Sequence, residues 1–168
     1  SDRIYKDCEN LIDEELKLPE DKRMEVISIL TPNFLHFPMA KKLIQNGFNI
    51  ICEKPLTTTY EEALELEVLQ KEKETVFAVT YTYTGYPMVR QMKDMIRRGV
   101  LGTIQKVDLQ YYQGWINPVI HNPQERSKVL RLDPEKSGLS CCIGDIGTHA
   151  FNMLEHLTGM EVKKLLAD

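Results

Sequence analysis

Three short apolar runs constrain the fold of this 168-residue chain more than any other feature of its sequence. They lie in MEVISILTPN (24–33), FNIICEKP (48–55) and TVFAVTYTYTGYP (75–87), and each ends in turn residues. Apolar runs that are nearly continuous and rich in β-branched residues are typical of strands buried on both faces of a parallel sheet. The sequence therefore predicts three parallel strands.

Helical patterns separate and follow these runs. The segment 38–46 forms the first pattern, and Thr59 with Glu62 has the spacing of a capping box that opens a second helix running to about Lys73. A third helix is expected before Gly99, with these residues on one face: Met88, Met92, Met95 and Ile96. Strand and helix alternate, which indicates an α/β fold with a parallel sheet.

The pattern changes after the third helix. Successive side chains in residues 103–112 would point to opposite faces of a strand, and one of these faces is more polar than the other. This alternation predicts the first strand of a second, antiparallel sheet. The segment 113–140 is rich in Pro, Asn, Gly and charge and is predicted to be a long excursion loop, a type of loop that is usually functional. A helix at about 144–158 and a short strand at 161–168 complete the prediction.

Composition excludes several classes of protein. With 42% hydrophobic and 27% charged residues the chain is globular, and a net charge of −4 gives no support for a nucleic-acid or anionic-membrane partner. No apolar run reaches the roughly 18 residues of a membrane span, and no signal peptide is visible, so the expected location is the cytoplasm. The cysteines have no CxxC spacing and suit reduced thiols: Cys8, Cys52, Cys141 and Cys142.

Ligands of open α/β sheets bind outside the carboxyl ends of the strands, so the residues after each apolar run are the first site candidates. Lys54 follows the second run, where desolvation would lower its pKa and let it exchange a proton with a substrate hydroxyl. Alternatively it is a solvated charge at a strand end, with Pro55 only stopping the strand. His36, after the first run, is either a site residue or an exposed residue in the first turn of its helix.

A second candidate is the stretch GDIGTHAFNMLEH. Asp145 and His149 lie one helical turn apart, followed by Asn152 and His156 on the same side. A carboxylate beside an imidazole fixes the ring tautomer and suits a general base that acts on an alcohol. The alternatives are a capped surface helix with solvated histidines, or a metal site with Cys142, although no second cluster supplies further ligands.

Aromatic residues form a weaker candidate. Tyr111, Tyr112 and Trp115 would offer an apolar platform to a sugar ring, or they simply pack within the sheet.

Several motifs, in this order and spacing, give the chain a family resemblance: TPNFLH (31–36), EKP (53–55), YTGYPMVRQ (83–91), LGTI (101–104), LRLDPEKSG (130–138) and GDIGTHAFNMLEHLTG (144–159). From about residue 3 onward the chain resembles the Gfo/Idh/MocA family of NAD(P)-dependent oxidoreductases. An EKP motif alone would mean little, but EKP followed some ninety residues later by GDIGTH is specific.

The resemblance implies hydride transfer between a nicotinamide cofactor, NAD or NADP, and a secondary hydroxyl of a sugar or cyclitol. Lys54 would hydrogen-bond the reacting hydroxyl, His149 would accept its proton, and Asp145 would be the carboxylate partner of His149. The residues that would border the cofactor are Thr31, Pro32, Asn33, His36, Glu53 and Pro55. Those that would contact the small-molecule substrate are Tyr83, Arg131 and Asn152, and no metal is implied.

One family feature is missing from these residues. Family members bind the pyrophosphate with a glycine-rich turn, and the chain has no GxGxxG motif. The resemblance therefore implies a fragment, with 1–85 as the C-terminal part of a Rossmann domain and 86–168 as the start of an α+β substrate or oligomerisation domain. Such a chain alone is expected to bind cofactor weakly and to have little or no activity.

The doubly wound topology of the family also implies that the strand at 26–31 has an unpaired edge, which predicts self-association into a homo-oligomer. Two other classes of function are left open. One is a non-catalytic binding or assembly module that keeps the fold, and the other is a metal-dependent isomerase or lyase.

Overall fold

The computed structural model describes residues 3–167, and the chain divides into two compact units. Unit 1 comprises Ser1–Thr80 and Asp133–Leu139, and unit 2 comprises Tyr81–Leu132 and Ser140–Asp168. A segment of unit 1 thus comes from the region 113–140 of the sequence. The domain boundary expected at residue 85 stays a prediction.

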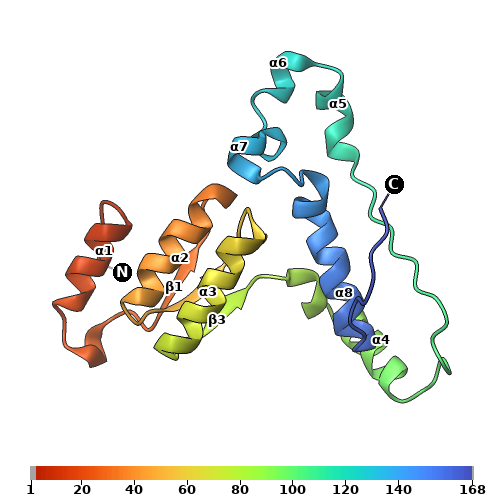
Figure 1. Ribbon diagram of the computed structural model, residues 1–168, viewed down its shortest axis with the longest axis horizontal. Helices are drawn as coiled ribbons and strands as arrows, with labels where there is room; N and C mark the ends of the chain where they lie inside the picture. The colour runs from red at the N-terminus through yellow and green to blue at the C-terminus, as the bar shows by residue number, and fades with distance from the viewer. Residues whose placement is uncertain (1–2, 168) are drawn as a thin grey trace. The chain divides into compact units, whose positions relative to one another are not determined.

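Unit 1 is built on a three-stranded parallel sheet in the order β1-β2-β3 (Figure 1). Its strands are β1 (Val26–Ile29), β2 (Asn49–Cys52) and β3 (Phe77–Val79). The register pairs Ile29 with Cys52 and Cys52 with Val79, so the three carboxyl ends lie level at one edge. The predicted α/β fold with a parallel, Rossmann-type sheet is confirmed.

Three helices of unit 1 lie side by side (Figure 1). They are α1 (Cys8–Leu16), α2 (His36–Gln45) and α3 (Tyr60–Lys73). Ion pairs join α1 to α2 through Glu9 and Lys42, and α2 to α3 through Lys41 and Glu65. Short pieces complete the unit: η1 (Glu20–Lys22), η2 (Asn33–Leu35) and α7 (Pro134–Ser137).

The second helix prediction is accurate at its first residue. The Thr59 hydroxyl accepts from the Glu62 amide, and the Glu62 carboxylate accepts from the Thr59 amide, which together form the capping box. This exchange satisfies amide groups that the first turn of α3 would otherwise leave without partners.

The core of unit 1 lies between the sheet and the helices. Its most buried apolar side chains are at most 1% exposed: Ile29, Ala40, Leu43, Ile44, Ile50 and Cys52. Each large aliphatic side chain buried in this way contributes about 1.5–3 kcal/mol. Burial also raises the pKa of the Cys52 thiol to about 12, so this thiol stays protonated at neutral pH.

β1 is one of the two edge strands of the sheet, and β3 is the other. Among the described residues no strand pairs with the second side of β1, and Val26 and Leu30 are 47% and 72% exposed. The predicted self-association through this edge stays a prediction.

Unit 2 contains two longer helices, α4 (Pro87–Arg97) and α8 (Thr148–Thr158), which pack along each other. A π-helical turn, η6 (Ile143–Gly147), leads directly into α8, so the helix predicted at about 144–158 is confirmed. The shorter pieces are η3 (Thr82–Gly85), η4 (Gly114–Ile116), α5 (Asn117–Ile120), α6 (Pro123–Arg126) and η5 (Leu130–Leu132).

The predicted loop at 113–140 is wrong in part, because the structure gives this region several single helical turns. Proline lies in the first turn of α5, α6 and α7, where its missing amide proton costs nothing. The side chains of Asn122 and Asp133 cap α6 and α7. Residues typical of loops are therefore also the residues that start these short helices.

The two strands predicted in this part are not present. Residues 103–112 and 161–167 have no strand structure, and residue 168 lies outside the described residues. Alternation of polar and apolar residues selects a face, but a strand also needs a neighbour for its backbone hydrogen bonds. The only sheet that the described residues form is the one in unit 1.

Candidate functional site

The carboxyl edge of the sheet in unit 1 is organised around His36. This side chain is fully buried, and its ring nitrogens lie 2.7 Å from the Pro55 carbonyl oxygen and 2.9 Å from that of Thr31. The imidazole thus joins the loop after β1 to the loop after β2. The alternative that His36 is an exposed residue in its helix is wrong.

Lys54 follows β2 at the same edge. It is partly buried, as is Glu53, whose carboxylate accepts a hydrogen bond from the Lys54 amide at 3.3 Å. The peptide bond to the buried Pro55 is cis. Lys54 thus lies between the end of β2 and a buried proline.

The LDPEKSG motif returns to this edge as part of unit 1. The Asn33 amide donates to the Ser137 carbonyl at 3.2 Å, although 104 residues separate them in the sequence. Gly138 has φ +87°, and a Cβ at this position would lie 3.4 Å from the Thr58 carbonyl oxygen. The donor group of Asn33, a residue predicted to border the cofactor, is therefore used by the chain itself.

This edge fits a polar ligand. The hydroxyl oxygen of Thr31, after β1, is buried and has no hydrogen-bond partner within residues 3–167, and the same holds for Thr80 after β3. Because a buried hydroxyl without a partner costs free energy, such groups suit a bound molecule that completes their hydrogen bonds. The carboxyl edge is also where open α/β sheets bind ligands, including dinucleotides.

In unit 2, Asp145 lies in the glycine-containing turn η6, which leads into α8. A Cβ at Gly144 would lie 2.5 Å from the Ser140 hydroxyl, and one at Gly147 would lie 3.0 Å from the Ile143 side chain. Only glycine fits these two positions without movement of a neighbour. π-helical turns are rare and occur frequently at functional sites.

His149, in the first turn of α8, is 7% exposed and lies among tyrosine rings. The Tyr81 ring meets it edge-on with centroids 5.6 Å apart, and the Tyr83 ring is tilted against it at 4.4 Å. The alternative of a surface helix with solvated histidines is therefore wrong for His149.

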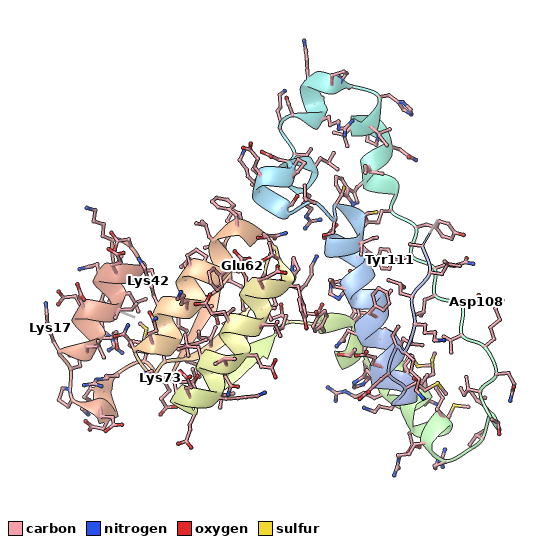
Figure 2. The ribbon with its side chains drawn as sticks, in the orientation of Figure 1. Lys17, Lys42, Glu62, Lys73, Asp108 and Tyr111 are labelled. Carbon is pink, nitrogen blue, oxygen red and sulfur yellow. The ribbon has the colours of Figure 1, made fainter. Side chains whose placement is uncertain are left out.

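Tyr111, whose place in the chain is labelled in Figure 2, continues this aromatic group. Its ring stacks on that of Tyr83 with centroids 5.9 Å apart, and the two hydroxyl oxygens lie 3.1 Å from each other. This hydrogen bond is the main cause that raises the pKa of Tyr83, so the phenol stays protonated at neutral pH.

A hollow of about 450 Å³ lies beside these rings, within the range of small-molecule sites. Its lining is mostly apolar: Tyr83, Tyr86, Leu109, Gln110, Tyr111, His149, Ala150 and Met153. Of the predicted aromatic platform only Tyr111 lines it, since Tyr112 is 87% exposed and Trp115 lies under the Arg131 guanidinium. The contact of Tyr111 with Tyr83 had no signal in the sequence, because the two residues are 28 positions apart.

Arg131 and Asn152, both predicted to contact substrate, differ in their surroundings. An Arg131 nitrogen lies 3.7 Å from an Asp145 carboxylate oxygen, which gives Asp145 a cationic neighbour. The Asn152 side-chain oxygen is buried and has no hydrogen-bond partner in the part of the chain that the structure describes. Their roles toward a substrate stay predictions.

The metal alternative has no support in the geometry. Within residues 3–167, no three His, Cys, Asp or Glu side chains group closely enough to hold a metal ion. Cys142 is exposed, whereas His149 is buried.

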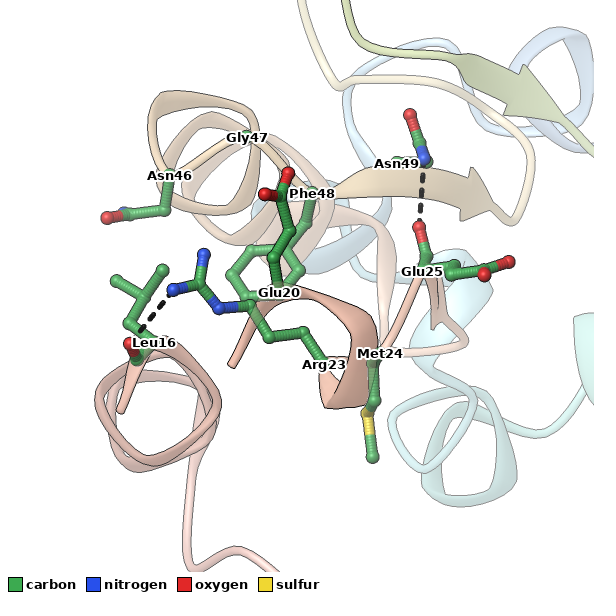
Figure 3. Close-up of a pocket in the computed structure, with 9 residues that line it drawn as sticks. All are labelled: Leu16, Glu20, Arg23, Met24, Glu25, Asn46, Gly47, Phe48 and Asn49. Carbon is green, nitrogen blue, oxygen red and sulfur yellow. Dashed lines mark hydrogen bonds between the residues drawn. The ribbon is translucent and has the colours of Figure 1, made fainter. Parts of the chain in front are cut away.

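A second hollow, of about 270 Å³, lies beside the amino ends of β1 and β2 (Figure 3). The Arg23 guanidinium donates to the carbonyl groups of Leu16 and Leu18, and the Asn49 amide donates to the Glu25 carbonyl. These polar groups hold the chain together at this end, so the hollow is structural.

Comparison with known families agrees with this arrangement. Residues 5–81 match the model described as "Oxidoreductase family, NAD-binding Rossmann fold", and residues 89–168 match the "GFO/IDH/MocA C-terminal domain". The chain belongs to the Gfo/Idh/MocA family. Residues 5–81 are thus part of an NAD-binding Rossmann domain, and the resemblance inferred from the motifs is confirmed.

Relatives support the same assignment. The chain is 35% identical over 169 residues to the Bacillus subtilis oxidoreductase YfiI, covering 100% of this chain and 42% of YfiI. It is 31% identical over 151 residues to levoglucosan dehydrogenase of Pseudarthrobacter phenanthrenivorans, covering 90% of this chain and 37% of that enzyme.

Among solved structures, an inositol dehydrogenase homologue from Azotobacter vinelandii in complex with NADH and myo-inositol matches with a TM-score of 0.78 and 30% identity. The match covers 92% of this chain and 38% of that one. The chain therefore spans about two fifths of the length of the relatives it matches. Among the described residues, no helix is both long enough and apolar enough to cross a membrane.

Proposed function

We propose that this chain carries the proton-transfer residues of an NAD(P)-dependent dehydrogenase that acts on a secondary hydroxyl of a sugar or cyclitol. The observation that carries the proposal is His149, buried among tyrosines beside a hollow of about 450 Å³ and one turn after Asp145. The substrate class is supported by the relatives, one of which is named for levoglucosan and another of which is complexed with myo-inositol.

In this proposal each residue has one task. The Lys54 ammonium donates a hydrogen bond to the oxygen of the reacting hydroxyl and stabilises the negative charge that develops there. The His149 imidazole accepts the hydroxyl proton, and the Asp145 carboxylate favours the resulting imidazolium. A nicotinamide, when bound, would accept the hydride from the carbon that carries the reacting hydroxyl.

The cofactor is proposed to lie at the carboxyl edge of the sheet in unit 1. The hydroxyl groups of Thr31 and Thr80 would complete their hydrogen bonds there. Pro32, Asn33, Glu53 and Pro55 would border the same ligand, with His36 holding the two loops together.

The test is an assay of the full product of the gene that encodes this chain, with the 168-residue chain beside it. Levoglucosan, myo-inositol and xylose are offered with NAD⁺ or NADP⁺, and the near-ultraviolet absorbance of the reduced nicotinamide is followed. We expect turnover of at least one polyol, and a loss of about 10²–10⁴-fold in His149→Asn and Lys54→Met.

The matched controls replace the same two residue types, a histidine and a lysine, at positions outside the proposed site. His156→Asn lies two turns further along α8, and Lys71→Met is an exposed lysine that pairs with Glu67 on α3. Both are expected to keep activity within about twofold, because Lys71 is exposed and neither residue lines the hollow beside His149. Turnover that survives in His149→Asn would contradict the proposal, and absence of turnover with every polyol would favour a non-catalytic module.

We also propose that the protein is a cytoplasmic homo-oligomer. The edge of β1, with which no strand pairs within residues 3–167, and the free cysteines support this proposal. Light scattering during gel filtration measures the oligomeric state, and a monomer at micromolar concentration would contradict it.

A further inference from the structure

We propose that Tyr83 and Tyr111 act as one positioning pair that holds the His149 imidazole in the orientation needed to accept a proton. The inference rests on the proposed function, because it concerns the proton acceptor assigned there. It adds a task for two residues that were predicted only to contact substrate: Tyr111, as part of an aromatic platform, and Tyr83.

The first step of the argument is the contact with His149. Centroids 4.4 Å apart place the Tyr83 ring in van der Waals contact with the imidazole, and Tyr81 meets it from a second direction at 5.6 Å. Such aromatic contacts have preferred geometries and restrict the rotation of a side chain. A ring that is 7% exposed and contacts two tyrosines has few other orientations open to it.

The second step is that Tyr83 itself needs to be held. It belongs to η3, a short 3₁₀ segment, and it is only partly buried. The stacking of Tyr111 at 5.9 Å and the hydroxyl contact at 3.1 Å supply two restraints from a segment without secondary structure of its own. Because one hydroxyl donates to the other, removal of either breaks the same hydrogen bond.

The third step is the cost of misplacement. A proton acceptor must lie within hydrogen-bonding distance of the proton it removes, and small displacements of a catalytic group reduce turnover strongly. The pair therefore affects kcat through the orientation of His149 more than it affects the binding of substrate.

The test combines one measurement without turnover and one with it. The ring signals of the chain's four histidines are recorded by NMR after selective labelling, and His149→Gln identifies the signal of His149. We expect Tyr83→Phe and Tyr111→Phe to shift this signal and to leave that of His121 in place. Tyr112→Phe is the control, because the Tyr112 hydroxyl donates to the Gln110 side chain and not to Tyr83, and the residue is 87% exposed.

In the full gene product, each of the two variants is expected to lower kcat by about three- to tenfold, the value of one hydrogen bond, with KM changed by less than about twofold. The double variant is expected to lose no more activity than either single variant, because each single variant already removes the hydrogen bond between the two hydroxyl groups. Tyr83→Leu, which also removes the ring contact, is expected to lose up to about 100-fold.

Two results would overturn the inference: a His149 signal and a kcat in Tyr111→Phe equal to those of Tyr112→Phe, or losses in the two single variants that multiply in the double variant. The NMR arm needs no substrate. A shifted His149 signal in a protein without turnover would support the positioning pair and contradict the proposed function. Turnover with an unshifted His149 signal would support the proposed function and contradict the positioning pair.

Discussion

The two units differ in what they bury. In unit 1 most of the buried side chains are apolar, with Ile29, Leu43 and Ile50 at most 1% exposed. Two polar side chains, Glu15 and His36, are also fully buried there. In unit 2 the only residues that are buried within the described part of the chain are Gly144 and His149. A core made of aliphatic side chains stabilises a fold, whereas a buried imidazole beside a hollow is typical of a functional site.

The comparison is tested most strongly by removing core volume. Leu43→Ala in α2 is expected to lower the free energy of unfolding of unit 1 by about 2–5 kcal/mol, because the side chain is fully buried. Met92→Ala in α4 of unit 2, where the residue is 46% exposed, is expected to change the free energy of unfolding of unit 2 by less than about 1 kcal/mol. Urea unfolding followed by circular dichroism measures both. Equal losses would contradict the difference between the units.

The buried carboxylate of unit 1 gives the next largest effect. Glu15 is fully buried, and it accepts from the Tyr5 hydroxyl, from the Met24 amide at 2.7 Å and from Arg3 at 2.9 Å. The bond from Tyr5 is the main cause that lowers the pKa of Glu15 below its usual value of 4.5. Glu15→Gln is therefore expected to destabilise the chain at neutral pH, by less than Leu43→Ala.

The pH dependence follows from the direction of this shift. A carboxyl whose pKa is lower in the folded state contributes stability above its unfolded pKa and loses it as pH falls through the folded pKa. The difference in unfolding free energy between the parent chain and Glu15→Gln is thus expected to be constant near neutral pH and to shrink below about pH 4. A difference that grows on acidification would contradict it.

A smaller effect is expected at the start of α3. Thr59→Ala removes one half of the capping box and is expected to cost about 1 kcal/mol. Tyr60→Phe, at the next residue and 71% exposed, is the matched control and is expected to have no measurable effect. Urea unfolding compares the two variants, and a control that costs as much as Thr59→Ala would mean that the cap contributes little.

The smallest effect is expected in unit 2. The Arg131 guanidinium lies 5.9 Å from the ring centre of Trp115, the chain's one tryptophan. Arg131→Gln is expected to change the tryptophan fluorescence while lowering the unfolding free energy by about 0.5–1 kcal/mol at most. Arg126→Gln, an exposed arginine of α6, is the control. An unchanged emission spectrum in Arg131→Gln would contradict the contact.

Sequence reasoning succeeded where the determinants are local. The apolar runs predicted β1, β2 and β3, and the Thr59 and Glu62 pair predicted the first residue of α3, because burial on both faces and helix capping act over a few residues. It failed for 103–112, because a strand depends on a partner that an alternating pattern does not reveal.

For the site, spacing predicted that Asp145 and His149 lie one helical turn apart, and η6 with Asp145 does lead directly into α8 with His149. The contacts of His36 with Pro55 and of Asn33 with Ser137 were not predictable, since they join residues 19 and 104 positions apart. The same is true of Tyr83 and Tyr111. Long-range packing decides such pairs, and a single sequence carries little information about it.

The most direct test of the central claim is a double-mutant cycle between Lys54 and His149, read as kcat/KM for polyol oxidation by the full gene product. If both groups act on the same alcohol, Lys54→Met/His149→Asn loses about as much as the worse single variant, because groups that work as a unit are not additive. Losses that multiply would show that the ammonium and the imidazole act independently, and would contradict this account.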